Sequence, residues 1–386
     1  MSDLPIPDAD ARAHSECVVS RIRDEIGASG GWIPFERYMT LALYAPGLGY
    51  YSAGATKLGA AGDFVTAPEM TPLFAQALSA QVAAILAASE RRDVVELGGG
   101  SGRLAADLLT ALAARDALPS RYAILEPSSD LRERQRATLA SQAPSLRARV
   151  VWLDELPAAL DGAVIANEVL DALPVHLVAR RAGLWYERGV TENAARGFEW
   201  SDRPADPRIE AIAAERFPPD GDYQSEINLA AEALVEDIGR RLVRGGAMLA
   251  IDYGFPAAEY YHAERNQGTL MCHYRHRAHT DPFFWPGLND ITAHVDFTAM
   301  ARAATRAGAH VAGFAAQAPF LLGCGILDAL AAMGEPGSRA YIEAAAPVQR
   351  LLSPSEMGEL FKVIAFARSE DIEWPGFAIA DHGYRL

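Results

Sequence analysis

The sequence predicts an α/β protein whose central β-sheet is parallel and covered by helices on both faces. From about residue 92 onward, short apolar runs alternate with helical segments, which is the pattern typical of parallel sheets. A glycine-rich turn follows the first apolar run. The chain of 386 residues is also long enough to bury a full core, in one large domain or two ordinary ones.

Before that point the chain has few strand signals. Residues 12–27 predict a short amphipathic helix, and an aromatic, glycine-rich stretch follows it. Thr71 and Pro72 predict a second helix start, since threonine caps a first turn and proline fits its first position. We therefore expect residues 1–90 to form a mostly helical cap or flap beside a sheet domain at 91–386.

Seven apolar runs predict the strands of the sheet. In chain order they are DVVELGG, YAILEPS, ARVVWLD, GAVIANE, AMLAIDYG, HVAGFAA and FKVIAFAR. Two insertions interrupt the series. At about 175–223, period-two alternation around turn residues predicts a hairpin or meander, whereas about 255–297 is irregular and rich in proline, histidine and aromatic residues. A long helix is expected at about 224–243, ahead of the fifth strand.

The charge balance argues against nucleic-acid binding. The formal net charge is -15 and no long run of lysine or arginine occurs, so a phosphate backbone would be repelled on average. The two lysines, Lys57 and Lys362, are followed by leucine and valine, whereas a phosphate-binding P-loop needs Gly-Lys-Ser/Thr. A Walker-type nucleotide hydrolase is therefore excluded.

Cysteine usage and the N-terminus favour a cytoplasmic protein. Cys17, Cys272 and Cys324 lie far apart and form no C-x-x-C pair, which fits a reducing compartment better than a disulfide framework. The acidic N-terminus has no apolar signal region and no arginine-rich transit helix. No apolar run has the length of a membrane span.

The turn after the first strand, ELGGGSG, contains Glu96 and three glycines at two-residue spacing, Gly98, Gly100 and Gly102. A dinucleotide-binding fingerprint that starts at Gly98 would need glycine where Arg103 stands, which disfavours a nicotinamide cofactor. Glycines in such a turn let a ligand approach the backbone closely. The acid and the loop carbonyls can face positive charge on that ligand.

This order of an acid and alternating glycines resembles motif I of class I (Rossmann-like) S-adenosylmethionine-dependent methyltransferases. The resemblance implies a seven-stranded sheet whose glycine loop approaches the methionine portion of S-adenosylmethionine. The loop residues concerned are Glu96, Gly98, Gly99, Gly100 and Gly102. Glu126, at the end of the second strand, would bind the ribose hydroxyls, and Asp154 or Leu153 would lie at the adenine edge. A tight strand-to-helix turn with a chance acid is the plainer alternative.

The fourth strand ends in Asn167 and Glu168, with Asp171 three residues later. In open parallel sheets, ligands bind beyond the carboxyl ends of the strands, and the fourth strand of a methyltransferase faces the methyl acceptor. If the chain is helical after Asn167, Glu168 and Asp171 share one face, where two carboxylates suit a guanidinium. Alternatively, Asn167 caps that helix, Glu168 lies in its first turn and Asp171 pairs with an internal arginine.

Longer stretches resemble the MidA-like methyltransferases that assist assembly of respiratory complex I. They are YMTLALYAPGLGYY, GDFVTAPEMTPLF, VVELGGGSGRLAADLL, ANEVLDALPVH, LAIDYG and PGLNDITAHVDF. This resemblance covers most of the chain and implies a protein arginine methyltransferase that modifies a core subunit of complex I. Because no transit peptide is present, we expect a bacterial, cytoplasmic member. One departure is Gly98-Gly99-Gly100 where the family often has Gly-Pro-Gly, which should keep the turn but loosen it.

The same resemblance assigns further residues to the site. A flap from the cap would close over the cofactor, and its residues are Gly62, Asp63, Phe64, Thr66 and Glu69. The alternative is an ordinary Gly-Pro loop ahead of a helix. Asp252 and Tyr253, at the end of the fifth strand, would lie beside the acceptor, and Tyr253 suits a core position equally well.

The histidine-rich segment CHYRHRAHTD does not predict a metal site. His273, His276 and His279 have a spacing that would align ligands on a helix, but Arg275 and Arg277 would repel a cation. We expect a surface loop that contacts a protein substrate or a partner.

Two other functions stay open at this point. One is methyl transfer to a small molecule or lipid by the same fold, with the cap enclosing the acceptor. The other is an assembly factor that binds S-adenosylmethionine without turnover. A Ser-His-Asp hydrolase is not supported, because no G-x-S-x-G nucleophile elbow occurs.

Overall fold

A computed structural model of the protein describes residues 4–53 and 66–386, and the chain divides into two compact units. The sheet unit comprises Val65–Leu170, Ala233–Gly254 and Phe297–Leu386. The cap unit comprises Met1–Phe64, Asp171–Glu232 and Phe255–Asp296. The cap unit therefore combines the N-terminal segment with residues from both predicted insertions.

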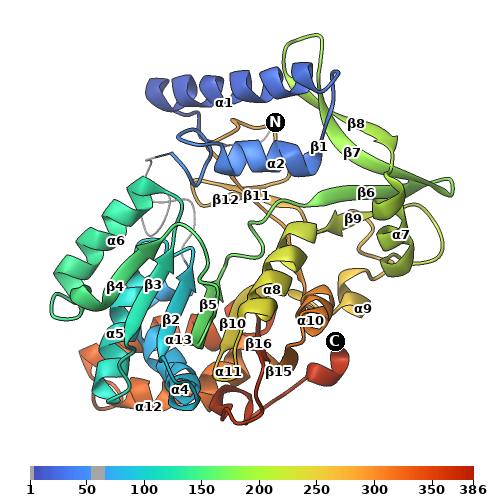
Figure 1. Cartoon of the computed structure of the whole chain (residues 1–386). Helices are drawn as coiled ribbons and strands as arrows, with labels where there is room; N and C mark the ends of the chain where they lie inside the picture. Colours follow the sequence, from blue (N-terminus) through green and yellow to red (C-terminus); the bar gives the residue numbers. More distant parts are fainter. Residues whose placement is uncertain (1–3, 54–65) are drawn as a thin grey trace. The chain divides into compact units, whose positions relative to one another are not determined.

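Seven strands of the sheet unit form a continuous path in the order β15-β16-β10-β5-β2-β3-β4 (Figure 1). Their bounds are β2 (Asp93–Leu97), β3 (Arg121–Leu125), β4 (Val150–Leu153), β5 (Gly162–Asn167), β10 (Ala247–Phe255), β15 (His310–Ala316) and β16 (Phe361–Ala367). The seven predicted strands are thus confirmed. Their buried, almost entirely apolar interiors, such as Val164 and Leu249, are typical of strands covered on both faces.

The sheet is mixed, which corrects the expectation of a purely parallel one. Strands β2, β3, β4, β5 and β10 are parallel to one another. Strand β16 enters between β10 and β15 and is antiparallel to both. The carboxyl ends of the five parallel strands still meet at one edge of the sheet, where the predicted site residues follow them.

The helices of the sheet unit connect these strands. They are α3 (Ala67–Met70), α4 (Pro72–Ala88), α5 (Arg103–Ala114), α6 (Ser129–Gln142), α10 (Phe297–Arg306), α11 (Gln317–Gly323), α12 (Ile326–Ala331), α13 (Arg339–Leu352) and α14 (Met357–Leu360). Short 3₁₀ turns occur at Arg147–Arg149, Pro375–Phe377 and Gly383–Arg385. Helix α8 (Leu229–Arg241) spans the boundary between the two units in sequence.

Helix α4 corrects the predicted boundary of the cap. Thr71 caps it by accepting a hydrogen bond of 3.3 Å from Leu73 N, and Pro72 takes the first helical position, as predicted. The helix contacts α5 and β5, and its Leu78 is fully buried in the hydrophobic cluster of the sheet. Residues 66–90 therefore lie in the sheet unit, where α4 buries most of its apolar side chains.

The cap unit contains two small antiparallel sheets and two N-terminal helices. Its elements are α1 (Ala9–Ala28), β1 (Ile33–Pro34), α2 (Phe35–Tyr44), β6 (His176–Arg181), β7 (Leu184–Glu192), β8 (Phe198–Pro204), α7 (Pro207–Arg216), β9 (Tyr223–Ile227), α9 (Ala257–Tyr260), β11 (Met271–Tyr274), β12 (Arg277–His279), β13 (Asp290–Thr292) and β14 (Val295–Asp296). One sheet has the order β1-β7-β6-β9, with β8 beside β7, and the other has the order β12-β11-β13. The predicted meander is confirmed as β6, β7 and β8.

Two segments differ from their predictions. The helix expected at about 224–243 begins as strand β9, which pairs with β6, and the helix α8 starts only after Asn228 caps it through Ala231 N at 2.8 Å. The segment 255–297, expected to be irregular, contains the β11–β12 hairpin and strand β13. No helix in the described part of the chain is long and apolar enough to cross a membrane.

Candidate active site

The turn between β2 and α5 adopts backbone conformations that favour glycine. Gly98, Gly100 and Gly102 have φ angles of +61°, +50° and +83°, all in the left-handed region. At Gly99, an added Cβ would lie 2.7 Å from the Ile124 side chain. The turn itself therefore requires glycine at these positions, and it also leaves the backbone bare for a ligand.

Glu96 lies in β2 just before this turn and is only 3% exposed. Its Oε2 accepts a hydrogen bond of 2.7 Å from the Tyr122 hydroxyl on β3. Burial raises the pKa of Glu96 to about 7, while the hydrogen bond from Tyr122 opposes this rise and the charge of Glu126 adds to it. A buried carboxyl gains from a cationic neighbour, so Glu96 suits the ammonium group of an amino-acid ligand.

Glu126 follows β3, as predicted, and is 4% exposed. Its Oε1 accepts a hydrogen bond of 3.0 Å from Ser128 N, and its Oε2 accepts one of 3.2 Å from Gln135 Nε2. Burial raises the pKa of Glu126 in spite of these hydrogen bonds and the nearby charge of Arg132. The orientation of this carboxylate is therefore set through both of its oxygens.

Asp154 lies one residue beyond β4, and its side chain is 89% exposed. Arg132 donates a hydrogen bond of 2.6 Å to Asp154 Oδ1. The same guanidinium donates to the backbone oxygens of Leu153 at 2.7 Å and Glu126 at 2.5 Å. Arg132 therefore ties the ends of β3 and β4 together, and Asp154 lies at the exposed rim beside it.

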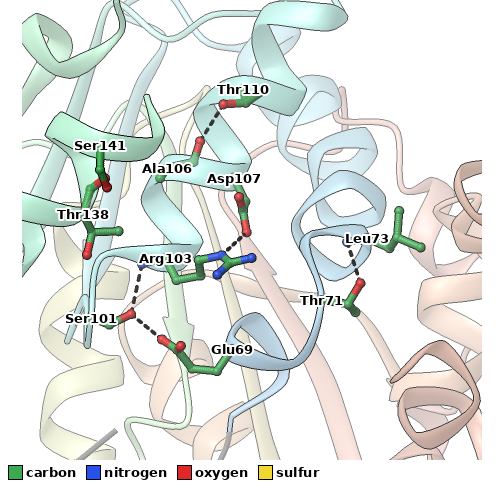
Figure 2. A network of polar contacts seen from close by, with 10 residues as sticks. All are labelled: Glu69, Thr71, Leu73, Ser101, Arg103, Ala106, Asp107, Thr110, Thr138 and Ser141. Carbon is green, nitrogen blue, oxygen red and sulfur yellow. Dashed lines mark hydrogen bonds and ion pairs between the residues drawn. The ribbon is translucent and has the colours of Figure 1, made fainter. Parts of the chain in front are cut away.

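Helix α3 contacts both the glycine loop and the end of β5. Figure 2 shows Glu69 accepting a hydrogen bond from the Ser101 hydroxyl in the glycine loop. Ser101 Oγ also accepts a hydrogen bond of 3.3 Å from Arg103 N at the start of α5. At the other end of α3, Ala67 N donates to Glu168 Oε1 at 3.4 Å. One short helix thus connects the loop with the strand end where the sequence predicts the acceptor.

Of the other predicted flap residues, the structure describes only Thr66. Thr66 takes the N-cap position of α3 without a side-chain capping hydrogen bond. Gly62, Asp63 and Phe64 lie outside the described residues. The contact between the predicted flap and the glycine loop therefore rests on Glu69.

The end of β5 is a turn and not the start of a helix. Glu168 has a φ of +53°, and its N–H donates to Ile251 O at 2.9 Å. Glu168 Oε1 also accepts a hydrogen bond of 3.3 Å from Asn167 Nδ2. Asn167 Oδ1 is buried and has no hydrogen-bond partner among the residues that the structure describes. Because turns follow, the expected helix is wrong: Glu168 and Asp171 share no helical face, and Asn167 caps none.

Asp252, in β10 directly after the last residue that pairs with β5, holds this turn in place. It is 1% exposed, and its Oδ2 accepts hydrogen bonds from Val169 N at 3.2 Å and Leu170 N at 3.0 Å. Its Oδ1 accepts one of 2.9 Å from Tyr253 N. A carboxylate oriented by three backbone amides is suited to positioning the turn after Glu168.

Asp171 belongs to the cap unit and is 4% exposed. Its carbonyl oxygen accepts a hydrogen bond of 3.0 Å from Ala293 N, and the Tyr44 hydroxyl donates to Ala172 O at 2.9 Å. Burial raises the pKa of Tyr51 well above its usual value, and the charge of Asp171 is among those that add to this rise. The side chain of Asp171 therefore lies near Tyr51 within the cap unit.

The histidine-rich segment is a hairpin and not a helix. His273 lies in β11 and His279 in β12, and His276 is in the turn between them with a φ of +62°. His279 Nε2 is 3.2 Å from Asn289 Oδ1. Over residues 4–53 and 66–386, no group of three or more His, Cys, Asp or Glu side chains is arranged to hold a metal ion.

Three polar residues at this edge of the sheet were not predicted: Gln135, Arg132 and Ser101. Gln135 and Arg132 come from a helix of low apolar content, in which a buried residue cannot be distinguished from an exposed one. Ser101 stands inside the glycine motif, but its partner Glu69 lies 32 residues away in the chain. Only the three-dimensional structure brings these groups to the site.

The groups present fit S-adenosylmethionine. One buried carboxylate, Glu96, lies near the end of β2 and another, Glu126, follows β3. The glycine turn has a bare backbone, and Asn167 Oδ1 is a buried acceptor without a partner among the described residues. Carboxylates suit the ribose hydroxyls and the ammonium group, and a bare backbone suits the methionine chain. These groups lie beyond the carboxyl ends of parallel strands, where open α/β sheets bind ligands.

Comparison with known proteins agrees with this fit. A family model of S-adenosyl-L-methionine-dependent methyltransferases matches residues 74–315. The mitochondrial protein arginine methyltransferase NDUFAF7 homolog of Drosophila melanogaster is 30% identical over 93% of this chain and 87% of its own. The mitochondrial protein arginine methyltransferase NDUFAF7 of Mus musculus is 29% identical over 87% of this chain and 81% of its own.

A solved structure is similar over its whole length. A COG1565 superfamily protein from Burkholderia thailandensis, crystallised with S-adenosyl-homocysteine bound, is 52% identical, covers 100% of both chains and has a TM-score of 0.95. S-adenosyl-homocysteine is what remains of S-adenosylmethionine after methyl transfer, and this protein uses S-adenosylmethionine as its cofactor. The chain belongs to the MidA-like family of S-adenosyl-L-methionine-dependent methyltransferases.

Proposed function

We propose that this methyltransferase modifies an arginine side chain of a protein substrate, which we infer to be a core subunit of respiratory complex I. The names of the Drosophila and mouse relatives, which match over most of both chains, support arginine as the acceptor. The structural observation that carries the proposal is Glu168, a carboxylate at the end of β5 in a left-handed turn. A half-buried acid held there is suited to a planar, cationic acceptor.

On the donor side, we propose that the glycine turn and the acids beside it hold the cofactor. Glu96 would face the ammonium group, and Glu126 would bind the ribose hydroxyls. Asp154 would lie at the adenine edge, and Glu69 and Thr66 would contribute to the cofactor site from the segment beside the glycine loop. When bound, S-adenosylmethionine supplies an electrophilic methyl group on a positively charged sulfur.

On the acceptor side, we propose that Glu168 orients and polarises the arginine. A guanidinium has a pKa above about 12 and is a poor nucleophile, so a carboxylate must hold its plane and stabilise the charge on the reacting nitrogen. The buried Asn167 Oδ1 offers one further acceptor for a guanidinium N–H. Asp171 would face the same group from the segment that follows, whereas Asp252 would act by positioning the turn.

The proposed function is tested with labelled S-adenosylmethionine and extract of bacterial cells that contain complex I. The expected result is label in one protein band, released as methylated arginine on acid hydrolysis. The matched control is Glu168→Gln, which should bind S-adenosyl-homocysteine normally but label nothing. We also propose a cytoplasmic location for the enzyme, which fractionation of cells would check.

The same experiment separates the other two functions. Label that appears in an organic extract would support methylation of a small molecule or a lipid. Saturable binding of S-adenosyl-homocysteine without transfer of label to any fraction would support an assembly factor without turnover. Either result would contradict arginine methylation.

A further inference from the structure

Gln135 is completely buried on α6, a helix whose other residues are mostly exposed. Its side-chain amide both donates and accepts hydrogen bonds. Nε2 donates to Gly100 O at 3.1 Å and to Glu126 Oε2 at 3.2 Å, and Oε1 accepts from Trp152 Nε1 at 2.7 Å. The amide therefore contacts the segments at the carboxyl ends of three neighbouring strands, β2, β3 and β4.

The direction of this amide follows from its partners. An indole N–H can only donate, so the atom that faces Trp152 Nε1 must be the amide oxygen. The NH₂ group is then left for the Gly100 carbonyl and the Glu126 carboxylate, both of which can only accept in their ordinary states. Reversing the amide would break all three hydrogen bonds at once.

The backbone of α6 is also close to the glycine loop at this residue. A Cβ on Gly102 would lie 2.9 Å from the Cα of Gln135. The loop and the helix are therefore packed so closely that residue 102 has no room for a side chain. The Gln135 side chain donates a hydrogen bond to Gly100, and the Gln135 backbone packs against Gly102.

We propose that Gln135 is a positioning residue for S-adenosylmethionine, because it fixes both the Gly100 carbonyl and the plane of the Glu126 carboxylate. Ser128 N holds one carboxylate oxygen of Glu126 and Gln135 holds the other. Each oxygen retains a lone pair for a ribose hydroxyl. This inference rests on the proposed role of Glu126 in cofactor binding, and it does not depend on the identity of the methyl acceptor.

The test is Gln135→Glu, which keeps the size of the side chain and the acceptor for Trp152. It replaces the NH₂ donor with an oxygen that faces a carbonyl and a carboxylate. We expect S-adenosyl-homocysteine to bind roughly 10- to 100-fold more weakly at pH 8, measured by isothermal titration calorimetry. The matched control is Gln142→Glu, the same charge change at an exposed position on the same helix, which should bind as the wild type does.

A pH profile distinguishes positioning from general damage to the fold. Two carboxylates that share a site hold a proton more tightly, and a shared proton restores one donor between residues 135 and 126. Binding by Gln135→Glu should therefore recover toward wild type as the pH falls from 8 to 5.5. Unchanged binding at pH 8, or an equal deficit at both pH values, would overturn the proposal.

Gln135→Met provides a second variant if Gln135→Glu does not fold. It keeps the volume but donates no hydrogen bond, so folded Gln135→Met should also bind S-adenosyl-homocysteine at least about tenfold more weakly. Adding Gln135→Met to Glu126→Gln should cost little more than Glu126→Gln alone, because Gln135 acts through the Glu126 carboxylate. Wild-type affinity in folded Gln135→Met, or full additivity with Glu126→Gln, would leave Gln135 a purely structural residue.

Discussion

The Glu69 carboxylate accepts a hydrogen bond from the Ser101 hydroxyl and so attaches helix α3 to the glycine loop (Figure 2). A charged acceptor strengthens such a bond. We expect Ser101→Ala to weaken binding of S-adenosyl-homocysteine roughly 3- to 10-fold, because the loop loses its contact with the flap. Titration calorimetry measures the change directly.

The control for this prediction is Thr110→Ala. Thr110 lies on helix α5, which follows the loop, and its hydroxyl donates to Ala106 O at 2.8 Å, away from the loop (Figure 2). This variant loses a hydroxyl of the same kind but should bind S-adenosyl-homocysteine normally. Equal affinities in Ser101→Ala and Thr110→Ala would show that the contact between Glu69 and Ser101 has no part in cofactor binding.

Local features of the sequence predicted much of this fold. The seven strands were found because each is a short apolar run next to a turn, and the glycine turn because its residues are adjacent in the chain. The direction of β16 could not be found in this way. The direction of β16 depends on which strands lie beside it in the sheet, and no local sequence pattern indicates those neighbours.

The same holds for the candidate site: features of adjacent residues were predicted, whereas contacts between distant residues were not. Glu126 and Glu168 were predicted because each directly follows a strand, but the left-handed φ of Glu168 was missed, since glutamate rarely adopts it. The role of Asp252 depends on the backbone of Val169 and Leu170, which lie 83 and 82 residues away. Contacts over such separations follow from the topology of the sheet and not from composition or spacing.

Glu168→Gln should bind S-adenosyl-homocysteine as the wild type does and lose at least about 100-fold in methyl transfer. The substitution keeps the size of the side chain and its hydrogen bond with Ala67 N, but it removes the charge that we propose orients the acceptor. Calorimetry measures binding, and transfer of labelled methyl to protein measures activity. Normal turnover in this variant would exclude a catalytic role for Glu168.

Glu168→Gly provides a stability control for the same position. A φ of +53° strains glutamate but not glycine, so the variant should unfold at a denaturant concentration no lower than wild type while remaining inactive. If Glu168→Gly were less stable, the side chain would hold the turn together, and loss of activity in either variant would no longer identify a catalytic group.

Asp252→Ala should lower the free energy of unfolding by roughly 2–5 kcal/mol, because the amides of Val169, Leu170 and Tyr253 lose their buried acceptor. Asp252→Asn should cost less, since its single oxygen can still accept from Val169 and Leu170. Urea denaturation measures both costs. Asp252→Asn should also keep most of the methyl transfer, whereas loss of transfer in folded Asp252→Asn would indicate that the charge of Asp252 acts on the acceptor.

The buried Glu96 predicts a pH dependence of stability. Its folded pKa of about 7 lies above the unfolded value of 4.5, so the native state binds the proton more tightly than the unfolded state does. The free energy of unfolding should therefore fall as the pH rises from about 4.5 to 7. The contribution is at most about 3 kcal/mol, since each unit of pKa difference corresponds to about 1.36 kcal/mol.

Two variants isolate this contribution in urea denaturation at pH 5, 6, 7 and 8. Glu96→Gln cannot ionise, so its stability relative to wild type should improve across this range. Tyr122→Phe removes the hydrogen bond that lowers the pKa of Glu96, so the folded pKa of Glu96 should be higher in this variant. The free energy of unfolding of Tyr122→Phe should therefore fall by more than that of the wild type as the pH rises, and the fall should continue to a higher pH. A constant difference between Glu96→Gln and wild type at all four pH values would mean that Glu96 ionises in the folded protein as readily as in the unfolded chain, and that its burial beside Tyr122 carries no electrostatic cost.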